Sequence, residues 1–273
     1  MDMVLIKSVL TSFLSAAIVF GFMFLIKVIM DKLVASHYDA DVEIEENNNL
    51  GIALRRAGLY GGIAIAMFFT LGDIKMQFIN GATVVGFMFI ALIISEKIVF
   101  PSFDNTVALK AGNVSLGFAE AGLYLGTGVI AMASMAGTGP WISTIVFFVL
   151  GQLVLLLAVR LAEFTNKGLL EEIKLGNVAA GIMLGGMTFA YALILKGAIM
   201  GPFTGWAADI TAFAISTVLG GLMLFLFANK AIDKLFLPGS SITKEIKEKN
   251  VAAITVVIGL KIAIAFIISG AVL

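Results

Sequence analysis

The sequence lacks the residues that build disulfides and most metal sites. It contains no cysteine, which excludes disulfide bridges and thiolate ligands. Its single histidine, His37, stands in an acidic segment, and metal sites need clustered ligands, so we expect no metal site there. Charged residues make up 13% of the 273 residues, about half of their usual share in soluble domains. The formal net charge of zero argues against nucleic acid as a partner.

Signatures of enzymes are missing as well. There is no phosphate-binding glycine loop, no histidine-rich metal motif and no nucleophile elbow. The sequence therefore predicts a protein that is not an enzyme and needs no cofactor.

Apolar residues, in contrast, are abundant and continuous. They make up 60% of the chain, and runs of roughly 20 recur along its whole length, which is the helical length that crosses a bilayer. Runs of this kind favour helices over the alternating strands of a membrane barrel. We predict an all-α polytopic membrane protein with eight spans, at about 8–30, 49–71, 79–100, 113–135, 141–162, 177–199, 209–230 and 250–271.

One pattern occurs four times and divides the chain into repeats. Each copy opens with Asn, has Gly nine residues later, and has a polar or charged residue eleven residues after the Asn. Fixed offsets of this kind indicate one duplicated structural unit. The copies are NLGIALRRAGLYGGIAIA, NVSLGFAEAGLYLGTGVI, NVAAGIMLGGMTFAYALI and NVAAITVVIGLKIAIAFI, which begin at Asn49, Asn113, Asn177 and Asn250 and carry Gly58, Gly122, Gly186 and Gly259.

Each copy occupies the second helix of a predicted hairpin, so four hairpins run in parallel. We group them as two pairs, residues 1–135 and 136–273. Of the Lys and Arg residues, only Lys7, Lys75 and Lys196 lie near the short connections between hairpins, so the long connections inside the hairpins should be cytoplasmic and both termini outside. The first span has some features of a signal peptide, but it aligns with the later spans, and we expect it to be retained.

The polar positions of the four copies fall on equivalent helix faces, because offsets 0, 4, 7 or 8, and 11 share one side of a helix. Lys261, at offset eleven, should lie about 16 Å into the membrane, where an unpaired charge is costly. We therefore expect a buried polar cluster of Arg56, Glu120 and Lys261, with Tyr60 and Tyr124 beside it. The alternative is that these groups only fix the helix register, or that the two arginines reach back to the surface.

The repeated Asn and Gly residues have simpler expected roles. The four Asn residues should cap the helices that they begin, since Asn is a leading N-cap residue; alternatively they form a polar ring at a vestibule. The four Gly residues point away from the polar face. Each should pack against a neighbouring span, such as its hairpin partner, because small residues let membrane helices approach closely.

These features together resemble a known family. The segments EIEENNNLGIALRRAGLYGG, GNVSLGFAEAGLYLG, EIKLGNVAAGIMLGG and EIKEKNVAAITVVIG are similar to the YjfL-like bacterial inner-membrane proteins, which carry domain of unknown function 350. The resemblance covers essentially the whole chain as tandem copies and implies a bacterial inner-membrane location. The fourth copy departs from the pattern, with Ile254 and Ile258 in place of small residues. The family implies no activity and no functional residues.

Two functions are compatible with these observations. The first is a small transporter or channel whose polar path is lined by the Asn-led helices. The second is a membrane scaffold that docks cytoplasmic proteins through its charged connections. The lipid bilayer is the one partner that the sequence requires; a cytoplasmic protein partner and a homo-oligomer are both compatible with it.

Overall fold

The computed structural model describes residues 3–34, 36–101 and 103–272, and the regular structure in these ranges is entirely helical. Within them, eight helices are long and apolar enough to cross a membrane, which confirms the expected class. They are α1 (Met3–Val34), α3 (Leu50–Met67) with a 3-10 turn (Phe68–Thr70), α4 (Ile74–Ile94) with a π turn (Ser95–Val99), α6 (Val114–Ala136), α7 (Trp141–Thr165), α9 (Val178–Ile199), α10 (Trp206–Gly221) continuing through a π turn (Leu222–Phe227) into α11 (Ala228–Leu235), and α13 (Val251–Val272).

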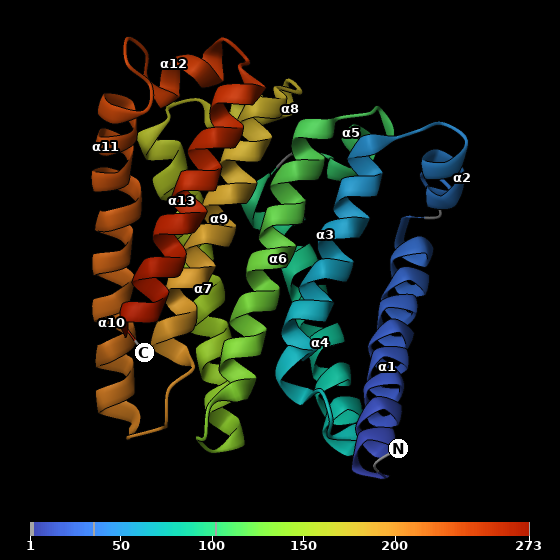
Figure 1. Ribbon diagram of the computed structural model, residues 1–273. Helices are drawn as coiled ribbons and strands as arrows, with labels where there is room; N and C mark the ends of the chain where they lie inside the picture. Colours follow the sequence, from blue (N-terminus) through green and yellow to red (C-terminus); the bar gives the residue numbers. More distant parts are fainter. Residues whose placement is uncertain (1–2, 35, 102, 273) are drawn as a thin grey trace.

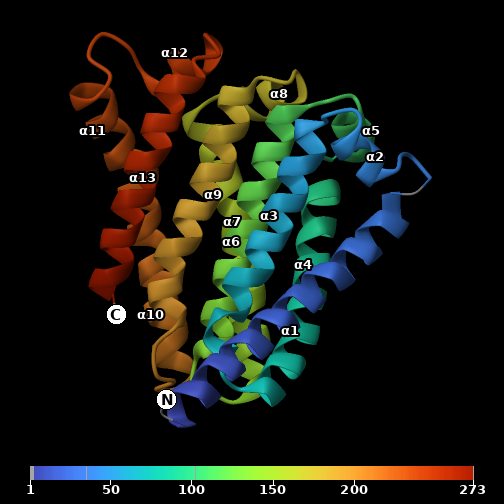
Figure 2. The same ribbon diagram turned by 45° about the vertical axis from the view of Figure 1, so that its right-hand side comes forward.

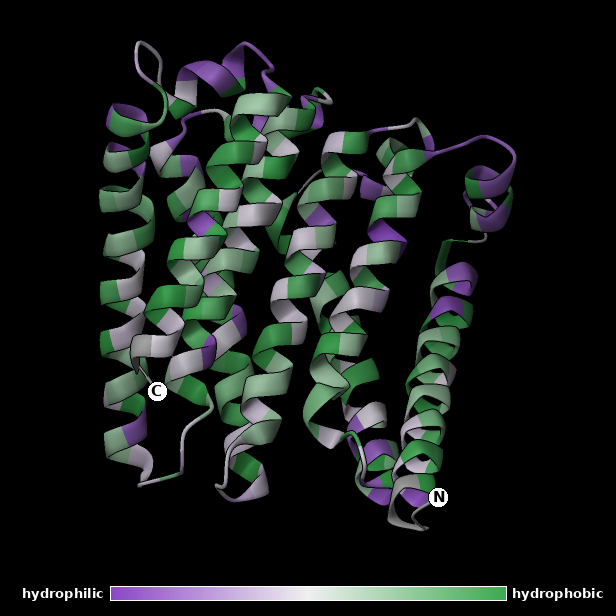
Figure 3. Ribbon diagram, in the orientation of Figure 1, coloured by the Kyte–Doolittle hydropathy of each residue, from purple (hydrophilic) through white to green (hydrophobic). Residues whose placement is uncertain are grey.

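Short helices lie in the long connections, all at one end of the molecule (Figure 1). Hydrophilic residues concentrate at this end, and hydrophobic residues cover the spans (Figure 3). We call this end the long-loop side; the N-terminus lies at the opposite end, with the short connections. The short helices are α2 (Ala40–Glu45), α5 (Asn105–Lys110), α8 (Leu169–Lys174) and α12 (Ile242–Lys247).

The spans form two layers. The Asn-led helices stand side by side in the order α3, α6, α9, α13, and each contacts the next (Figures 1 and 2). The first helices of the hairpins form the second layer, in which α4 and α7 lie behind the row and α1 and α10 stand at its two sides (Figures 1 and 2). Phe87 of α4 stacks on Phe148 of α7, and Phe147 of α7 meets Phe213 of α10 edge-on, so the second layer is continuous there. The repeats therefore succeed one another along a row and do not close around a central axis.

The recurring glycines are what bring the Asn-led helices together. A Cβ atom at Gly58 would overlap Ala121, one at Gly122 would overlap the backbone of Gly185, and one at Gly186 would overlap Ile258. These three glycines thus pack on a neighbouring span, as expected, but that span is the next Asn-led helix and not the suggested hairpin partner. Gly259 has open space around it, because α13 ends the row.

Candidate functional site

A buried carboxylate on α6 is the centre of a polar site in the first half of the chain. Glu120 is completely buried. Its Oε1 accepts hydrogen bonds of 2.8 Å from Ser95 Oγ and of 2.8 Å from Asn105 Nδ2. Its Oε2 lies 3.1 Å from Nε of Arg55 on α3. Side chains from α3, α5, the π turn and α6 thus converge on one carboxyl group.

Arg55 is shared between two carboxylates. Its guanidinium is 3% exposed, and its Nη2 donates a 3.0 Å hydrogen bond to Glu96 Oε1. Its Nη1 has no hydrogen-bond partner, and neither do the buried Oδ1 of Asn105 and the hydroxyl of Tyr124. Buried polar atoms are usually paired, so this group keeps hydrogen-bonding capacity beyond the contacts described above.

The π turn at the end of α4 accounts for part of this geometry. Ser95 and Glu96 are adjacent in sequence, and in an α-helix adjacent residues point about 100° apart. Here both reach the same site, Ser95 at Glu120 and Glu96 at Arg55. π turns are rare and occur frequently at functional sites.

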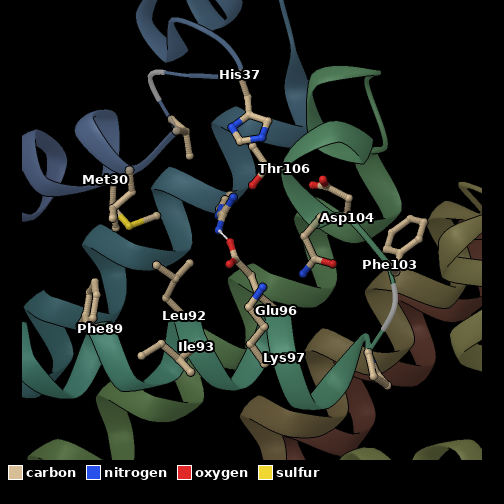
Figure 4. A pocket seen from close by; sticks show the side chains of 15 residues that line it. Met30, His37, Phe89, Leu92, Ile93, Glu96, Lys97, Phe103, Asp104 and Thr106 are labelled. Atoms are coloured by element: carbon tan, nitrogen blue, oxygen red, sulfur yellow. Dashed lines mark hydrogen bonds and ion pairs between the residues drawn. The ribbon is translucent and has the colours of Figure 1, made fainter.

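A pocket of about 660 Å³ on the long-loop side leads to this group. Figure 4 shows its two kinds of wall. Apolar side chains of α1 and α4, among them Met30, Phe89 and Ile93, lie on one side, and Glu96 and Asp104 lie on the other. Among the described residues, Arg55 is the one that an Asn-led helix contributes to the lining of the pocket. The polar pocket therefore forms between α1, α3, α4 and α5, and the predicted line of Asn-led faces does not supply it.

Arg56 belongs to a separate ion group nearer the long-loop surface. Its guanidinium pairs with Asp31 of α1 and Asp41 of α2. Lys27 joins the same carboxylates, at 2.8 Å from Asp31 and 2.7 Å from Asp41. Tyr60 borders the small cavity that Arg56 and Lys27 also line. The hydrogen bonds from Lys27, and then those from Arg56, hold the pKa of Asp41 below its usual value.

Lys261 lies in the second half and contacts neither Glu120 nor Arg56. It is completely buried, and its Nζ donates to the carbonyl oxygen of Leu224 at 3.1 Å and to the side-chain oxygen of Asn229. The predicted cluster of Arg56, Glu120 and Lys261 is therefore wrong. The prediction assumed that the Asn-led helices surround a common centre, whereas in the row α9 stands between α6 and α13.

The hairpin partners, not a central cavity, receive the polar faces of the Asn-led helices. Glu120 meets Ser95 at the π turn of its partner α4, and Lys261 meets Leu224 within the π turn that follows its partner α10. Tyr124, one turn below Glu120, is also completely buried. Glu120 of the second hairpin and Lys261 of the fourth thus each lie against a π turn.

The four Asn residues cap their own helices, and the first three also join neighbouring repeats. The side-chain oxygen of each accepts from a backbone N–H of the first turn of its helix, as Asn49 does from Ile52 at 3.2 Å. The amide nitrogen of Asn49 donates to Leu109 O at 2.9 Å, at the end of the next short helix. Asn113 and Asn177 repeat this contact with Ile173 O at 3.0 Å and Ile246 O at 2.7 Å. Asn250, at the end of the row, donates to Glu245 within its own repeat at 2.6 Å.

Sequence reasoning missed four members of the site. Arg55 lies one position before the predicted polar face, and Glu96 lies at a predicted span edge, so the sequence pattern assigns neither to the site. Ser95 and Asn105 carried no signal, because one polar residue at a predicted span edge is unremarkable. Among the described residues, no three His, Asp or Glu side chains are placed to hold a metal ion.

Comparison with known proteins agrees with this architecture. A relative named UPF0719 transmembrane protein, from Aquifex aeolicus (strain VF5), is 24% identical over 254 residues, which cover 88% of this chain and 92% of the relative. No solved structure matches the chain. The family model described as Domain of Unknown Function (DUF350) matches residues 3–135 and again residues 136–272. The chain is thus a multi-pass membrane protein that belongs to the DUF350 family, in two tandem copies, as its resemblance predicted.

Proposed function

We propose that this protein is a small membrane transporter whose binding site is the first-half pocket. The observation that carries the proposal is that a 660 Å³ pocket ends at a buried ion group with an unpaired guanidinium nitrogen, Nη1 of Arg55. The volume lies within the range of about 300–1,000 Å³ that small-molecule sites occupy. Ionisable residues inside membrane spans are costly, and in most proteins they mark a transport path.

The burial of Glu120 outside the pocket lining favours a carrier over an open channel. Arg55 and Glu96 line the pocket, whereas Glu120 lies behind them. Because Arg55 is shared by two carboxylates, a ligand or a proton can replace one partner while the other keeps the arginine paired. Such an exchange gives the group two alternative arrangements, which a carrier needs in order to open the site to each side in turn.

The scaffold remains the competing function, and one observation favours it. The short helices of the long connections form a polar surface on one side of the membrane (Figure 3), and α2 exposes Glu45 and Glu46 there. Docking on that surface would not need the pocket. The two functions therefore differ in whether the interior of the pocket ever becomes accessible from the opposite side.

Single-cysteine labelling in sealed vesicles separates them, and the absence of native cysteine makes each introduced thiol unique. Leu92 is a 6% exposed residue of the pocket wall. If the protein is a transporter, a Leu92→Cys variant should react with a membrane-impermeant thiol reagent added on either side of the membrane. Val107→Cys and Thr204→Cys, at exposed positions of the two ends, serve as matched markers of each side. Reaction of the Leu92→Cys variant from the Val107 side alone would refute transport and leave the scaffold.

For orientation, we propose that the long-loop side faces the cytoplasm of a bacterial cell, with both termini outside, because most Lys and Arg residues lie near the long connections. A cysteine within residues 231–249 should then be protected in intact cells and react only after permeabilisation. Reaction in intact cells would reverse the orientation.

A further inference from the structure

We propose that the ligand of this pocket is a membrane phospholipid whose headgroup carries both a phosphate and an ammonium group. The inference rests on the proposed binding site and names its substrate class. Three features of the pocket carry it: its position beside the bilayer, its apolar wall, and the balance of charges on its polar wall.

The pocket forms where α1 and α4 diverge. Nearer the short-loop side the two helices touch, since Phe22 of α1 packs against Gly81 and meets Phe78 edge-on. Nearer the long-loop side the same helices no longer close on each other, and Met30 of α1 and Ile93 of α4 line the pocket between them. Both residues lie near the long-loop ends of membrane-spanning segments, and Asp104 and Thr106 of the following connection line the same pocket. The pocket therefore lies where the bilayer meets the long-loop surface, and a lipid headgroup has access to it.

The apolar wall of the pocket suits contact with the hydrocarbon chain of a lipid. Leu33, Phe89 and Ile93 line the pocket and are 47%, 38% and 46% exposed. Apolar surface of this kind is stabilised by contact with acyl chains and destabilised by water. A small water-soluble ligand would leave this wall uncovered, whereas the upper part of a lipid chain would cover it.

The polar wall carries both signs of charge. Arg55 and Lys97 supply two cationic groups, and Glu96 and Asp104 supply two carboxylates. Lys97 is exposed and has no ion pair among the described residues, so it is free to bind a phosphate. Glu96 and Asp104 can bind an ammonium group. A ligand with both groups satisfies this wall, because its phosphate can meet Lys97 and its ammonium group can meet Asp104, whereas a purely anionic headgroup would leave Asp104 without a counter-charge.

Ligand binding can be measured directly on the purified full chain. Delipidated protein is incubated with phosphatidylethanolamine, phosphatidylglycerol or water-soluble glycerophosphoethanolamine, and bound molecules are counted by native mass spectrometry. We expect phosphatidylethanolamine to be retained about tenfold more strongly than phosphatidylglycerol, which corresponds to one charge-assisted contact. The soluble headgroup should not compete at equal concentration.

Two variants locate the binding. Lys97→Glu should lower retention of phosphatidylethanolamine about tenfold, because a phosphate contact becomes a repulsion; Lys97 has no intramolecular ion pair in the described structure, so folding is expected to be unaffected. Phe89→Ala should weaken retention by a smaller factor. Lys244→Gln, an exposed residue of α12 far from the pocket, is the matched control and should bind as the parent does.

The outcomes distinguish this inference from the transport proposal. Equal retention of the two lipids, or retention that Lys97→Glu does not change, would overturn the lipid assignment. Full competition by glycerophosphoethanolamine would overturn it in favour of a soluble zwitterion. Either result leaves the two-sided labelling of the Leu92→Cys variant untouched, and one-sided labelling would in turn leave lipid binding intact.

Discussion

The two halves of the molecule share one backbone plan and differ in where they place charge. In the first half, Arg55, Asn105 and Glu120 form the polar site. The equivalent positions of the second half, by offset from the repeated Asn, hold Met183, Ile242 and Val257, and all three are buried and apolar. Where the first half has a pocket wall, the second half has ordinary hydrophobic packing.

The acidic residues that end the first helices show the same division. In the first half, Asp31 and Glu96 pair with arginines. In the second half, Glu163 accepts from the backbone nitrogen of Gly168 at 2.8 Å, and Asp233 from that of Ile242 at 2.7 Å, so both cap the entry to a short helix. The repeated Asn and Gly residues hold the row together in both halves, whereas the ion pairs that join different helices lie, among the described residues, in the first half.

The largest effect is expected from breaking the first-half ion group. Glu120→Leu leaves Arg55 with only a partly exposed partner, and breaking a buried pair costs about 3–5 kcal/mol. This cost is measured as the decrease in the free energy of unfolding of the Glu120→Leu variant, relative to the parent, in mixed micelles.

The decisive comparison is a triple variant that carries the second-half residues, Arg55→Met, Asn105→Ile and Glu120→Val. We expect it to recover most of the lost stability, because replacing a whole buried pair by apolar residues is often neutral. It should lose two-sided labelling of the Leu92→Cys variant. A triple variant as unstable as Glu120→Leu would show that the site is required for folding.

In the second half, the buried ionisable group to test is Lys261. Asn229→Leu removes a side-chain acceptor and should destabilise by about 1.5–3 kcal/mol, the range for hydrogen bonds to charged groups. Adding Lys261→Met removes the orphaned charge, and we expect the double variant to regain stability. If the double variant is no more stable than Asn229→Leu, Lys261 is not held by this contact.

An added methyl group should disturb the packing of the Asn-led helices at one glycine and leave it unchanged at another. Gly122→Ala forces a Cβ atom into the backbone of Gly185, and overpacking of this kind costs about 1–3 kcal/mol. Gly259→Ala is the matched control, because nothing lies within 4 Å of a Cβ atom there. The thermal unfolding midpoint of Gly122→Ala should therefore fall, whereas that of Gly259→Ala should fall less or rise. Equal shifts of the two midpoints would contradict the close glycine contacts along the row.

The Asn residue at the end of the row should likewise contribute less to stability than an Asn residue inside the row. Asn113→Ala removes a cap and a bond to the next repeat, so we expect a loss of about 0.5–2 kcal/mol. Asn250→Ala removes a cap but no bond to a further repeat and should cost less. Denaturant unfolding of both variants measures the difference, and an equal loss would argue against the inter-repeat role.

The smallest effect concerns Asp41. Its pKa is lowered in the folded protein, so its contribution to stability is complete above its unfolded pKa of about 3.9 and is lost as the pH falls through the lowered value. The stability difference between the parent and Asp41→Asn should accordingly shrink as the pH falls from about 6 toward 3. A difference that does not change with pH would mean that the contacts of Asp41 with Lys27 and Arg56 are absent in solution.

How much of this could be predicted follows from the physics of each feature. Hydropathy and fixed offsets are local properties of the chain, and they predicted the eight spans and the repeated unit, while the resemblance of the repeated segments predicted the family. The partners of Glu120 depend on which helices become neighbours, and periodicity alone does not distinguish a row from a ring. The π turn at Ser95 has no signature in an apolar run, so the convergence of Ser95, Glu96 and Arg55 could not be derived from helical spacing.

The most direct measurement compares one equivalent position in the two halves. Asn105 and Ile242 each begin a short helix, and each is 2% exposed. If the first half alone carries an accessible site, an Asn105→Cys variant reacts with a small water-soluble thiol reagent through the pocket, whereas an Ile242→Cys variant stays protected. Equal protection, or faster reaction at position 242, would contradict the division of the molecule into a binding half and a packed half.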